Sequence, residues 1–570
     1  MKIAAAISVP MITFVMLAVP LLNQPIDTWE WLNLCAGQRI AATGVPSVDC
    51  PVAPAPSPSQ ESASPPALLL NHPPSSAYLI AAALRLFGNG EGQARLPGVL
   101  AVVLTAALLA IFARRAFRDD RQTADRVAFV AVCLYLIHPA TMQGALYLSF
   151  SEGTLLPLSW LLFLLTWFET LGQPLVVRAG MLGLCFAIAL SAKITTSLAL
   201  PVSMAIVTWG MEGFGPAGLL FTGVAGLGLM LFLGSWWAYA VYLASLVGLP
   251  AETLWTEPFR YLMGEGRVVE ASISDLLLNV SRTVVFLGPL LMTMAGIATA
   301  RRIRQYARDH QVQPLDLIPI LAAVVLVGYL ALPGGTGAFP KYHLVILPLL
   351  AWLAAQDFPP AALRRSLLAT VFVVGIIYYF YLVGDPLKLV NHDMRIARFA
   401  GGTTSVVWHL GLAALFYVIF PLVASRLVRS WRPAVLTTAV ASQMGLILLQ
   451  INGGYFAKHS YGTPLADFTR TIDLVRSATP TRSEILALPE FGYKTGRRIV
   501  PGMRRDLWSD PESLEKVIRQ GKPSAIVYGL PTHTISQLRD LSGDSRLNAT
   551  LERAYRRVDV GEFTVWLRGP

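Results

Sequence analysis

Ala94-Arg-Leu-Pro-Gly-Val-Leu-Ala-Val-Val-Leu-Thr-Ala-Ala-Leu-Leu-Ala-Ile-Phe-Ala113 is an almost uninterrupted apolar stretch that ends at the basic pair Arg114-Arg115. A helix of about 20 apolar residues is long enough to cross the hydrocarbon core of a bilayer. Thirteen such stretches follow one another, near residues 3–22, 94–113, 127–147, 153–170, 176–192, 195–210, 217–247, 279–300, 314–332, 342–357, 366–384, 408–425 and 433–451. The sequence therefore predicts a polytopic α-helical membrane protein with about 13 transmembrane helices, since a β-barrel would show short alternating segments instead.

The composition supports this class, because only 14% of the 570 residues are charged and 54% are hydrophobic. Soluble domains carry about 25% charged residues. The net charge of +11 comes largely from arginines in short connections, which is the distribution of cytoplasmic loops and does not indicate nucleic acid. Each basic cluster follows an even-numbered segment: Arg114, Arg115, Arg118, Arg121, Arg126; Arg301, Arg302, Arg304, Arg308; Arg364, Arg365; Arg426, Arg429, Arg432.

These clusters set the expected topology. With the N-terminus inside, they are all cytoplasmic, and every odd-numbered segment leads to an outer loop. Residues 3–22 are expected to remain as the first helix, because no small-residue cleavage site follows them. The first outer loop, 24–93, contains residues 75–87, which are apolar but too short to span and therefore predict an interfacial helix.

The chain changes character after about residue 452. Short apolar runs at Glu484 and Ser524 are bounded by turn residues and predict strands, and residues 464–477 and 511–520 have helical periodicity. We expect a transmembrane domain over residues 1–451 and a small soluble α/β domain over 452–570 on the outer side.

Asp27 and Glu152 are candidate catalytic acids on the expected outer side. Asp27 follows the first apolar segment, with Glu30 three residues later, and Glu152 opens the fourth segment at the second outer turn. Charged side chains at a membrane boundary are costly unless they are solvated or used in chemistry. Asp27 is either a general base or metal ligand, or a solvated acid. Glu152 either binds substrate, holds a metal or assists Asp27, or is an acid favoured by the helix dipole.

Cationic and aromatic side chains occur at the same expected face. His72 lies in the stiff turn Asn71-His-Pro-Pro74, where it contacts a phosphate, positions an acceptor or has no role. Arg95 and Lys193 each either extend toward lipid headgroups or bind an anionic lipid phosphate. Lys341, Tyr342 and His343 bring a cation, a phenol and an imidazole together before the tenth segment.

The chain has four cysteines, of which Cys133 and Cys185 lie in apolar segments. Cys35 and Cys50 both lie in the first outer loop, so an oxidising compartment would allow a disulfide between them. No paired-cysteine or histidine spacing of a metal site occurs. Two acids on one side leave a divalent metal open without requiring it.

The order of these motifs resembles the N-terminal signature of the GT-C membrane glycosyltransferases. The matching pieces are Ile26-Asp-Thr-Trp-Glu30, a Gly-Val-Pro loop, His72-Pro-Pro-Ser-Ser-Ala-Tyr78, Leu86-Phe-Gly88 and Ala94-Arg-Leu-Pro-Gly98. The nearest branch is that of bacterial protein O-mannosyltransferase-like and lipid A aminoarabinose transferase-like enzymes, whose later helix resembles Lys341-Tyr-His-Leu-Val-Ile-Leu-Pro348. The motif match covers residues 20–100 and a few later turns; elsewhere only the architecture agrees.

The resemblance implies a polyprenyl-phosphate-linked sugar donor and transfer with inversion at the anomeric carbon. Asp27 stands in the position of the family's catalytic acid, and Glu152 in that of its second acid. Glu30 becomes a supporting acid. His72 matches the mannosyltransferases, whereas the aminoarabinose branch has lysine there. Lys193 lies near a recurrent lysine turn. The Trp-Trp-Asp-Tyr-Gly motif of oligosaccharyltransferases is absent, which argues against transfer of a whole oligosaccharide.

The sequence thus predicts an inverting glycosyltransferase in a bacterial inner membrane, with its site facing the periplasm or exterior. The acceptor is a hydroxyl or phosphate on an envelope glycolipid, a glycan or a protein. No general acid is needed because phosphate is the leaving group, but a base such as Asp27 must take the acceptor's proton. A lipid or glycan transporter or flippase, and a polysaccharide-assembly protein without catalysis, are the alternatives. Neither mid-helix charges nor internal repeats favour a transporter.

Overall fold

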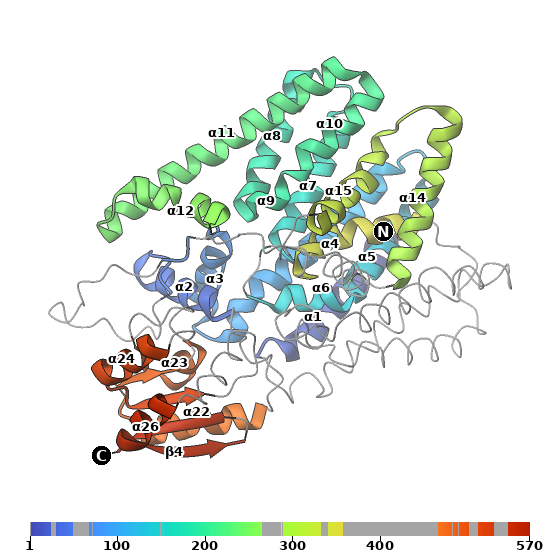
Figure 1. Ribbon diagram of the computed structural model, residues 1–570. Coiled ribbons are helices and arrows are strands. Elements are labelled where there is room, and N and C mark those ends of the chain that lie inside the picture. The colour runs from blue at the N-terminus through green and yellow to red at the C-terminus, as the bar shows by residue number, and fades with distance from the viewer. Residues whose placement is uncertain are drawn as a thin grey trace, which may run out of the picture.

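The computed structural model describes residues 2–23, 30–48, 68–70, 72–148, 151, 153–264, 287, 289–331, 340–356, 465–481, 483–487, 489–500, 511–528, 545–561 and 563–569. Figure 1 shows a helical bundle, a pair of short helices at its side, and a separate α/β unit at the C-terminal end. Fold and site are described below for these residues.

The bundle is made of apolar helices that pack around one core. Its largest fully buried side chains include Trp160, Trp167 and Trp352. Its helices are α1 (Lys2–Ala18), α4 (Glu91–Ala116), α5 (Arg121–Ile137), α6 (Pro139–Leu146), α7 (Leu155–Thr170), α8 (Leu175–Ala192), α9 (Ile194–Ser197), α10 (Ala199–Glu212), α11 (Phe214–Val247), α14 (Pro289–Asp309), α15 (Leu317–Ala331) and α16 (Leu347–Gln356), with short 3-10 helices η1 (Val19–Leu21), η2 (Pro314–Asp316) and η4 (Pro340–Ile346).

The multi-pass membrane character follows from the lengths of these helices. Within the described residues, four are long and apolar enough to cross a bilayer: α4, α9 with α10, α8 and α11. A fifth span arises if the bent pair α5 and α6 is one span. Shorter apolar helices cover residues of other predicted segments. The predicted segments 366–384, 408–425 and 433–451 lie outside the described residues, so the count of 13 stays a prediction.

One predicted segment is not a continuous helix. Residues 127–147 were expected to cross as one element, but α5 ends at Ile137 and α6 begins at Pro139, with an angle of 70° between them. His138 is extended, with φ −68° and ψ 126°. A residue before proline is disfavoured in the helical region, and proline has no N–H for the helical ladder. The His-Pro sequence therefore explains the break.

Two short helices of the first loop pack side by side next to the bundle. They are α2 (Glu30–Thr43) and α3 (Ser75–Phe87), and α3 occupies the residues predicted for the interfacial helix. Gly37 allows this close packing, because a Cβ there would lie 2.5 Å from the Ile80 side chain. The Tyr78 hydroxyl donates to the Gly44 carbonyl at 3.1 Å and fixes the end of α2. That α3 lies in the membrane interface stays a prediction.

The C-terminal unit is a five-stranded sheet with helices, as the predicted α/β domain requires. Its strands are β1 (Glu484–Leu486), β2 (Arg498–Ile499), β3 (Ala525–Tyr528), β4 (Tyr555–Val560) and β5 (Phe563–Arg568). The strand order is β2-β1-β3-β5-β4, with β2, β1 and β3 parallel and β5 antiparallel to both β3 and β4. Its helices are α22 (Leu465–Ala478), α23 (Pro489–Thr495), α24 (Pro511–Gly521) and α26 (Ser545–Ala554).

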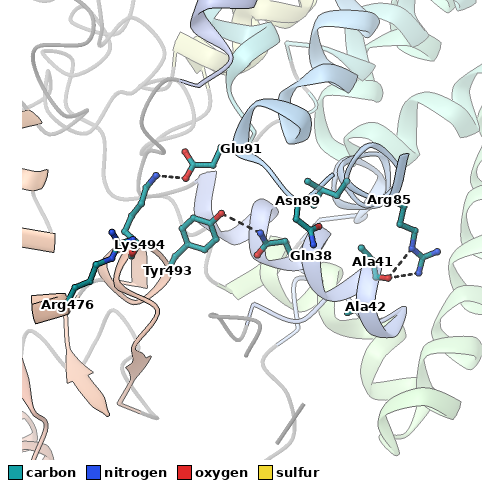
Figure 2. Close-up of a pocket in the computed structure, with 10 residues that line it drawn as sticks. Gln38, Ala41, Ala42, Arg85, Asn89, Glu91, Arg476, Tyr493 and Lys494 are labelled. Atoms are coloured by element: carbon teal, nitrogen blue, oxygen red, sulfur yellow. Dashed lines mark hydrogen bonds and ion pairs between the residues drawn. The ribbon is translucent and has the colours of Figure 1, made fainter. Parts of the chain in front are cut away.

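This C-terminal unit has its own core, which includes Phe468, Phe491 and Phe563 in mutual ring contact. It touches the rest of the chain through α23, which lies next to α2 and the start of α4 (Figure 1). Lys494 of α23 forms an ion pair with Glu91 at the first residue of α4. Figure 2 shows this pair beside a second contact, between the hydroxyl of Tyr493 and the amide of Gln38.

Candidate functional site

A buried ion pair connects three segments of the expected outer side. Arg95, near the start of α4, is fully buried and lies 3.2 Å from the carboxylate of Glu30, the first residue of α2. Its other nitrogens donate to the carbonyls of Leu146 at 2.8 Å and Leu22 at 2.7 Å. Glu30 Oε1 in turn accepts from the backbone N–H of Leu148 at 3.0 Å. Each charge is thus hydrogen-bonded, as a buried charge must be.

This network fixes the neighbours of both candidate acids. Leu22 and Glu30 lie on either side of Asp27 in the sequence, and Leu148 comes shortly before Glu152. Asp27 and Glu152 themselves lie outside the described residues. The described residues that flank them are joined through one arginine and one glutamate.

A second junction forms at Lys193, where the chain breaks between α8 and α9. Lys193 is extended, with φ −161° and ψ 123°, and only 5% of it is exposed. Ser75, at the start of α3, donates to the Ser191 carbonyl at 2.7 Å. Ser151 donates to the Ala192 carbonyl at 2.5 Å. The His72-Pro-Pro-Ser75 motif and the turn next to Glu152 therefore both bind the turn that carries Lys193.

Aromatic side chains from two further elements cover this lysine. The Lys193 ammonium lies 3.9 Å from the centre of the Tyr342 ring, in a cation–π contact. Tyr342 of η4 stacks on Tyr329 of α15 with ring centres 5.1 Å apart, and His343 packs edge-on against Tyr329 at 5.7 Å. The Tyr329 hydroxyl is in contact with the Thr196 hydroxyl of α9. The predicted Lys-Tyr-His motif thus meets the predicted lysine turn.

The remaining predicted site residues have varied outcomes. His72 is partly buried just before α3, and its contact with a phosphate stays a prediction. The side chain of Lys341 lies outside the described residues. Arg95 does not extend toward headgroups, because it is fully buried, and its binding of a lipid phosphate stays a prediction. Cys35 is disulfide-bonded; Cys50, its expected partner, lies outside the described residues.

Four residues at this junction were not singled out as site residues by the sequence: Ser75, Ser151, Thr196 and Tyr329. Ser75 belongs to the His-Pro-Pro motif and Ser151 precedes Glu152, so their neighbourhood was a usable signal. Tyr329 sits in an apolar segment and carries no such signal. Within the described residues, no group of three or more histidine, cysteine or acidic side chains is arranged to hold a metal ion.

The arrangement offers a buried cation, a phenol and hydroxyls at a helix break. An ionisable residue inside a membrane bundle marks a functional site by default. A lysine held in an aromatic setting can neutralise phosphate charge that develops on a leaving group. The described residues next to both candidate acids belong to the same connected part of the fold.

Comparison with known proteins agrees with this architecture. Residues 71–247 match the family model described as dolichyl-phosphate-mannose-protein mannosyltransferase. This range includes the His72 motif, the Arg95 helix and the Lys193 turn. A comparison with curated protein sequences found no match.

Solved structures extend the likeness to the whole chain. The crystal structure of ArnT from Cupriavidus metallidurans bound to undecaprenyl phosphate is similar with a TM-score of 0.59 and 16% identity, covering 100% of this chain and 99% of that one. Its apo state gives a TM-score of 0.58 at 15% identity. The apo oligosaccharyltransferase of Archaeoglobus fulgidus gives a TM-score of 0.50 at 13% identity, covering 97% of this chain and 73% of that one.

At these identities the structural likeness shows the fold, which is that of the GT-C proteins. The family model adds a sequence match over the part of the chain that contains the Lys193 turn. Both agree with the resemblance to GT-C membrane glycosyltransferases, in sequence over residues 71–247 and in fold over the whole chain. The resemblance inferred from the N-terminal motifs is thereby confirmed.

Proposed function

We propose that this protein transfers a sugar from a polyprenyl-phosphate donor to an acceptor on an envelope glycolipid, a glycan or a protein. The observation that carries the proposal is the Lys193 junction. There a buried ammonium lies over the Tyr342 ring, and Ser75 and Ser151 bind the backbone just before Lys193. The structural relative from Cupriavidus metallidurans was solved with undecaprenyl phosphate, which supports a lipid-phosphate donor.

The proposed transfer needs one general base and one cation from the protein. An acceptor oxygen attacks the anomeric carbon, the bond from that carbon to the phosphate oxygen breaks, and polyprenyl phosphate leaves with the electron pair. Asp27 takes the acceptor's proton as general base, and Lys193 stabilises the phosphate. Attack opposite to the leaving group inverts the configuration at the anomeric carbon.

The site is assigned to the outer face of a bacterial inner membrane. The arginine clusters support a cytoplasmic location for the opposite loops. A lipid-borne donor also suits this face, since cytosolic nucleotide sugars do not reach it. The match to the mannosyltransferase family model and the shared fold favour catalysis over the transporter and assembly-protein alternatives.

The proposal is tested by the change Asp27→Asn, which keeps the size of the side chain but removes its basicity. We expect loss of sugar transfer by the purified protein with a polyprenyl-phosphate sugar, while size-exclusion behaviour and thermal unfolding stay unchanged. Asp119→Asn, at an exposed acid in the connection between α4 and α5, is the matched control. Full activity of Asp27→Asn would rule out the general-base role.

The donor sugar and acceptor are identified by a second experiment. A deletion strain is compared with its complemented parent by mass spectrometry of envelope glycolipids and glycoproteins. The modification that disappears names the sugar and the acceptor together. An unchanged profile, combined with inactive purified protein, would contradict the proposed transfer.

A further inference from the structure

A cavity of about 650 Å³ lies where the C-terminal unit meets the helices of the first loop. Gln38 of α2 and Arg85 of α3 line one side, and Arg476 and Lys494 line the other (Figure 2). This volume is in the range of sites that bind small molecules, about 300–1,000 Å³. We call it the junction pocket, and it is separate from the Lys193 junction in its lining residues.

The walls of the junction pocket are held in place by several contacts. Arg85 donates through Nε and Nη2 to the Ala41 carbonyl, at 3.0 and 2.8 Å, which ties α3 to the end of α2. Gln38 Nε2 donates to the Tyr493 hydroxyl at 3.4 Å. Burial, and to a lesser extent the nearby Glu91 carboxylate, raises the pKa of Tyr493 to about 12, so this phenol is neutral. The pocket is therefore framed before any ligand enters.

The lining has an excess of positive charge and unused polar groups. Arg85, Arg476 and Lys494 are cationic and Glu91 is the one acid among the lining residues that the structure describes. Glu91 is already paired with Lys494. Among the described residues, Arg85 Nη1 and the exposed amide of Asn89 make no hydrogen bond. Guanidinium and ammonium groups bind phosphate through charge-assisted hydrogen bonds, and an amide can bind a sugar hydroxyl.

We propose that the junction pocket binds a phosphate-bearing sugar, and that it recognises the acceptor of this glycosyltransferase. The first statement rests on the charges and volume of the pocket alone. The second rests on the proposed function. A ligand here would contact both α2–α3 and the C-terminal unit, so its binding also strengthens the contact between them.

The test measures binding to the full-length protein in detergent by isothermal titration calorimetry. Glucose 1-phosphate is the probe. Glucose, which lacks the phosphate, and inorganic phosphate, which lacks the sugar, are the two controls. We expect glucose 1-phosphate to bind more tightly than either control. A second arm adds nanodiscs of phosphatidylglycerol or phosphatidylcholine as competitors. Competition by phosphatidylglycerol alone would assign the phosphate to a lipid headgroup, and no competition would assign it to a glycan.

Two variants locate the site. Asn89→Asp adds a carboxylate without removing a described contact, and Arg476→Gln removes a positive charge. We expect each to weaken binding of glucose 1-phosphate about tenfold, because Asn89→Asp adds a charge that repels the phosphate and Arg476→Gln removes one that attracts it. Arg557→Gln, which removes an exposed charge on β4, is the matched control and should bind normally.

Equal binding by glucose and glucose 1-phosphate, or unchanged binding by Asn89→Asp, would overturn the inference. Transfer activity is not needed for this readout. The pocket can thus fail the test while Asp27→Asn still abolishes transfer, and the reverse result is equally distinguishable. Weaker binding by Asn89→Asp with normal binding by Asn89→Gln would support the pocket and exclude a general effect of substitution.

Discussion

Arg95 and Glu30 together show how a buried ion pair can position a site without contacting substrate. The guanidinium reaches Glu30 and the carbonyls of Leu22 and Leu146, and these segments flank both candidate acids. Such a pair contributes little net stability compared with an apolar replacement, but loss of one partner strands the other charge in a dry interior. Its value lies in the relative placement of three segments.

Removing Arg95 alone is therefore predicted to be costly. Arg95→Met should lower the free energy of unfolding by about 3–5 kcal/mol, because the Glu30 carboxylate loses its cation. The double change Arg95→Met with Glu30→Met should cost clearly less than the sum of the single changes. Denaturant unfolding in detergent measures both values. Arg115→Met serves as control, since its pair with Glu169 is exposed and should contribute about 0–1 kcal/mol. Strict additivity of the two changes would contradict the coupling.

At the level of helices, Gly98 of α4 lies against the backbone of α6. A Cβ added to Gly98 would collide with the carbonyl oxygen of Ala145. Gly98 lies in the motif that includes Arg95, so this contact also sets the position along α4 at which Arg95 reaches the Leu146 carbonyl. The glycine is needed here for close approach and not for an unusual backbone angle.

We predict that Gly98→Ala destabilises the protein by about 1–3 kcal/mol, because overpacking forces the two helices apart. Thermal unfolding in detergent is the measurement. Gly226→Ala in α11 is the matched control, since a Cβ there meets nothing within 4 Å. The control should be neutral or up to about 1 kcal/mol more stable, owing to the higher helix propensity of alanine. Equal stability of the two variants would argue against the close contact.

The sequence allowed some elements to be predicted well and others not at all. The bounds of α3, α22 and α24 were close to the expected ranges because periodicity and turn residues mark them. The hairpin of β4 and β5 was missed, although Val558, Val560 and Val565 alternate with polar residues around Gly561. The break at His138 was missed because the apolar run continues through it.

The candidate site was predictable in its parts but not in its assembly. Motif order identified Lys193, Tyr342 and His343 as residues of one face. Their contact depends on tertiary packing: Tyr329 comes from an apolar helix with no local signal, and Ser75 reaches Ser191 across 116 positions. Periodicity describes single elements, so it does not report which distant turns meet.

At the scale of the whole molecule, the described residues attach the C-terminal unit through few polar contacts, among them Lys494–Glu91 and Gln38–Tyr493. The Glu91–Lys494 ion pair is partly buried, with 19% and 24% of the two side chains exposed. It joins the first turn of α4 to α23 of the C-terminal unit. Charge exchange across this pair therefore tests whether the two parts are docked as described.

We predict that Glu91→Lys and Lys494→Glu each loosen the docking by about 1–2 kcal/mol, which corresponds to a 5–30-fold shift in the equilibrium. The double exchange should largely restore it. Hydrogen exchange of peptides from α2 and α23 measures the effect, and Arg557→Glu on β4 is the control. Single variants that match the wild type would show that the ion pair does not hold the unit.

The 34 residues of α11 give it a length of about 51 Å at 1.5 Å per residue, whereas the hydrocarbon core of a bilayer is about 30 Å thick. Its far end, around Trp236 and Leu243, packs against Leu70 of the first loop and Leu254 of α12 (Ala251–Gly264). A helix with such an excess must tilt or project beyond the lipid. A change in bilayer thickness should therefore change the tilt of α11 and, through these contacts, the position of the first loop. We expect the rate of sugar transfer to differ between protein reconstituted in short-chain lipids and protein reconstituted in long-chain lipids.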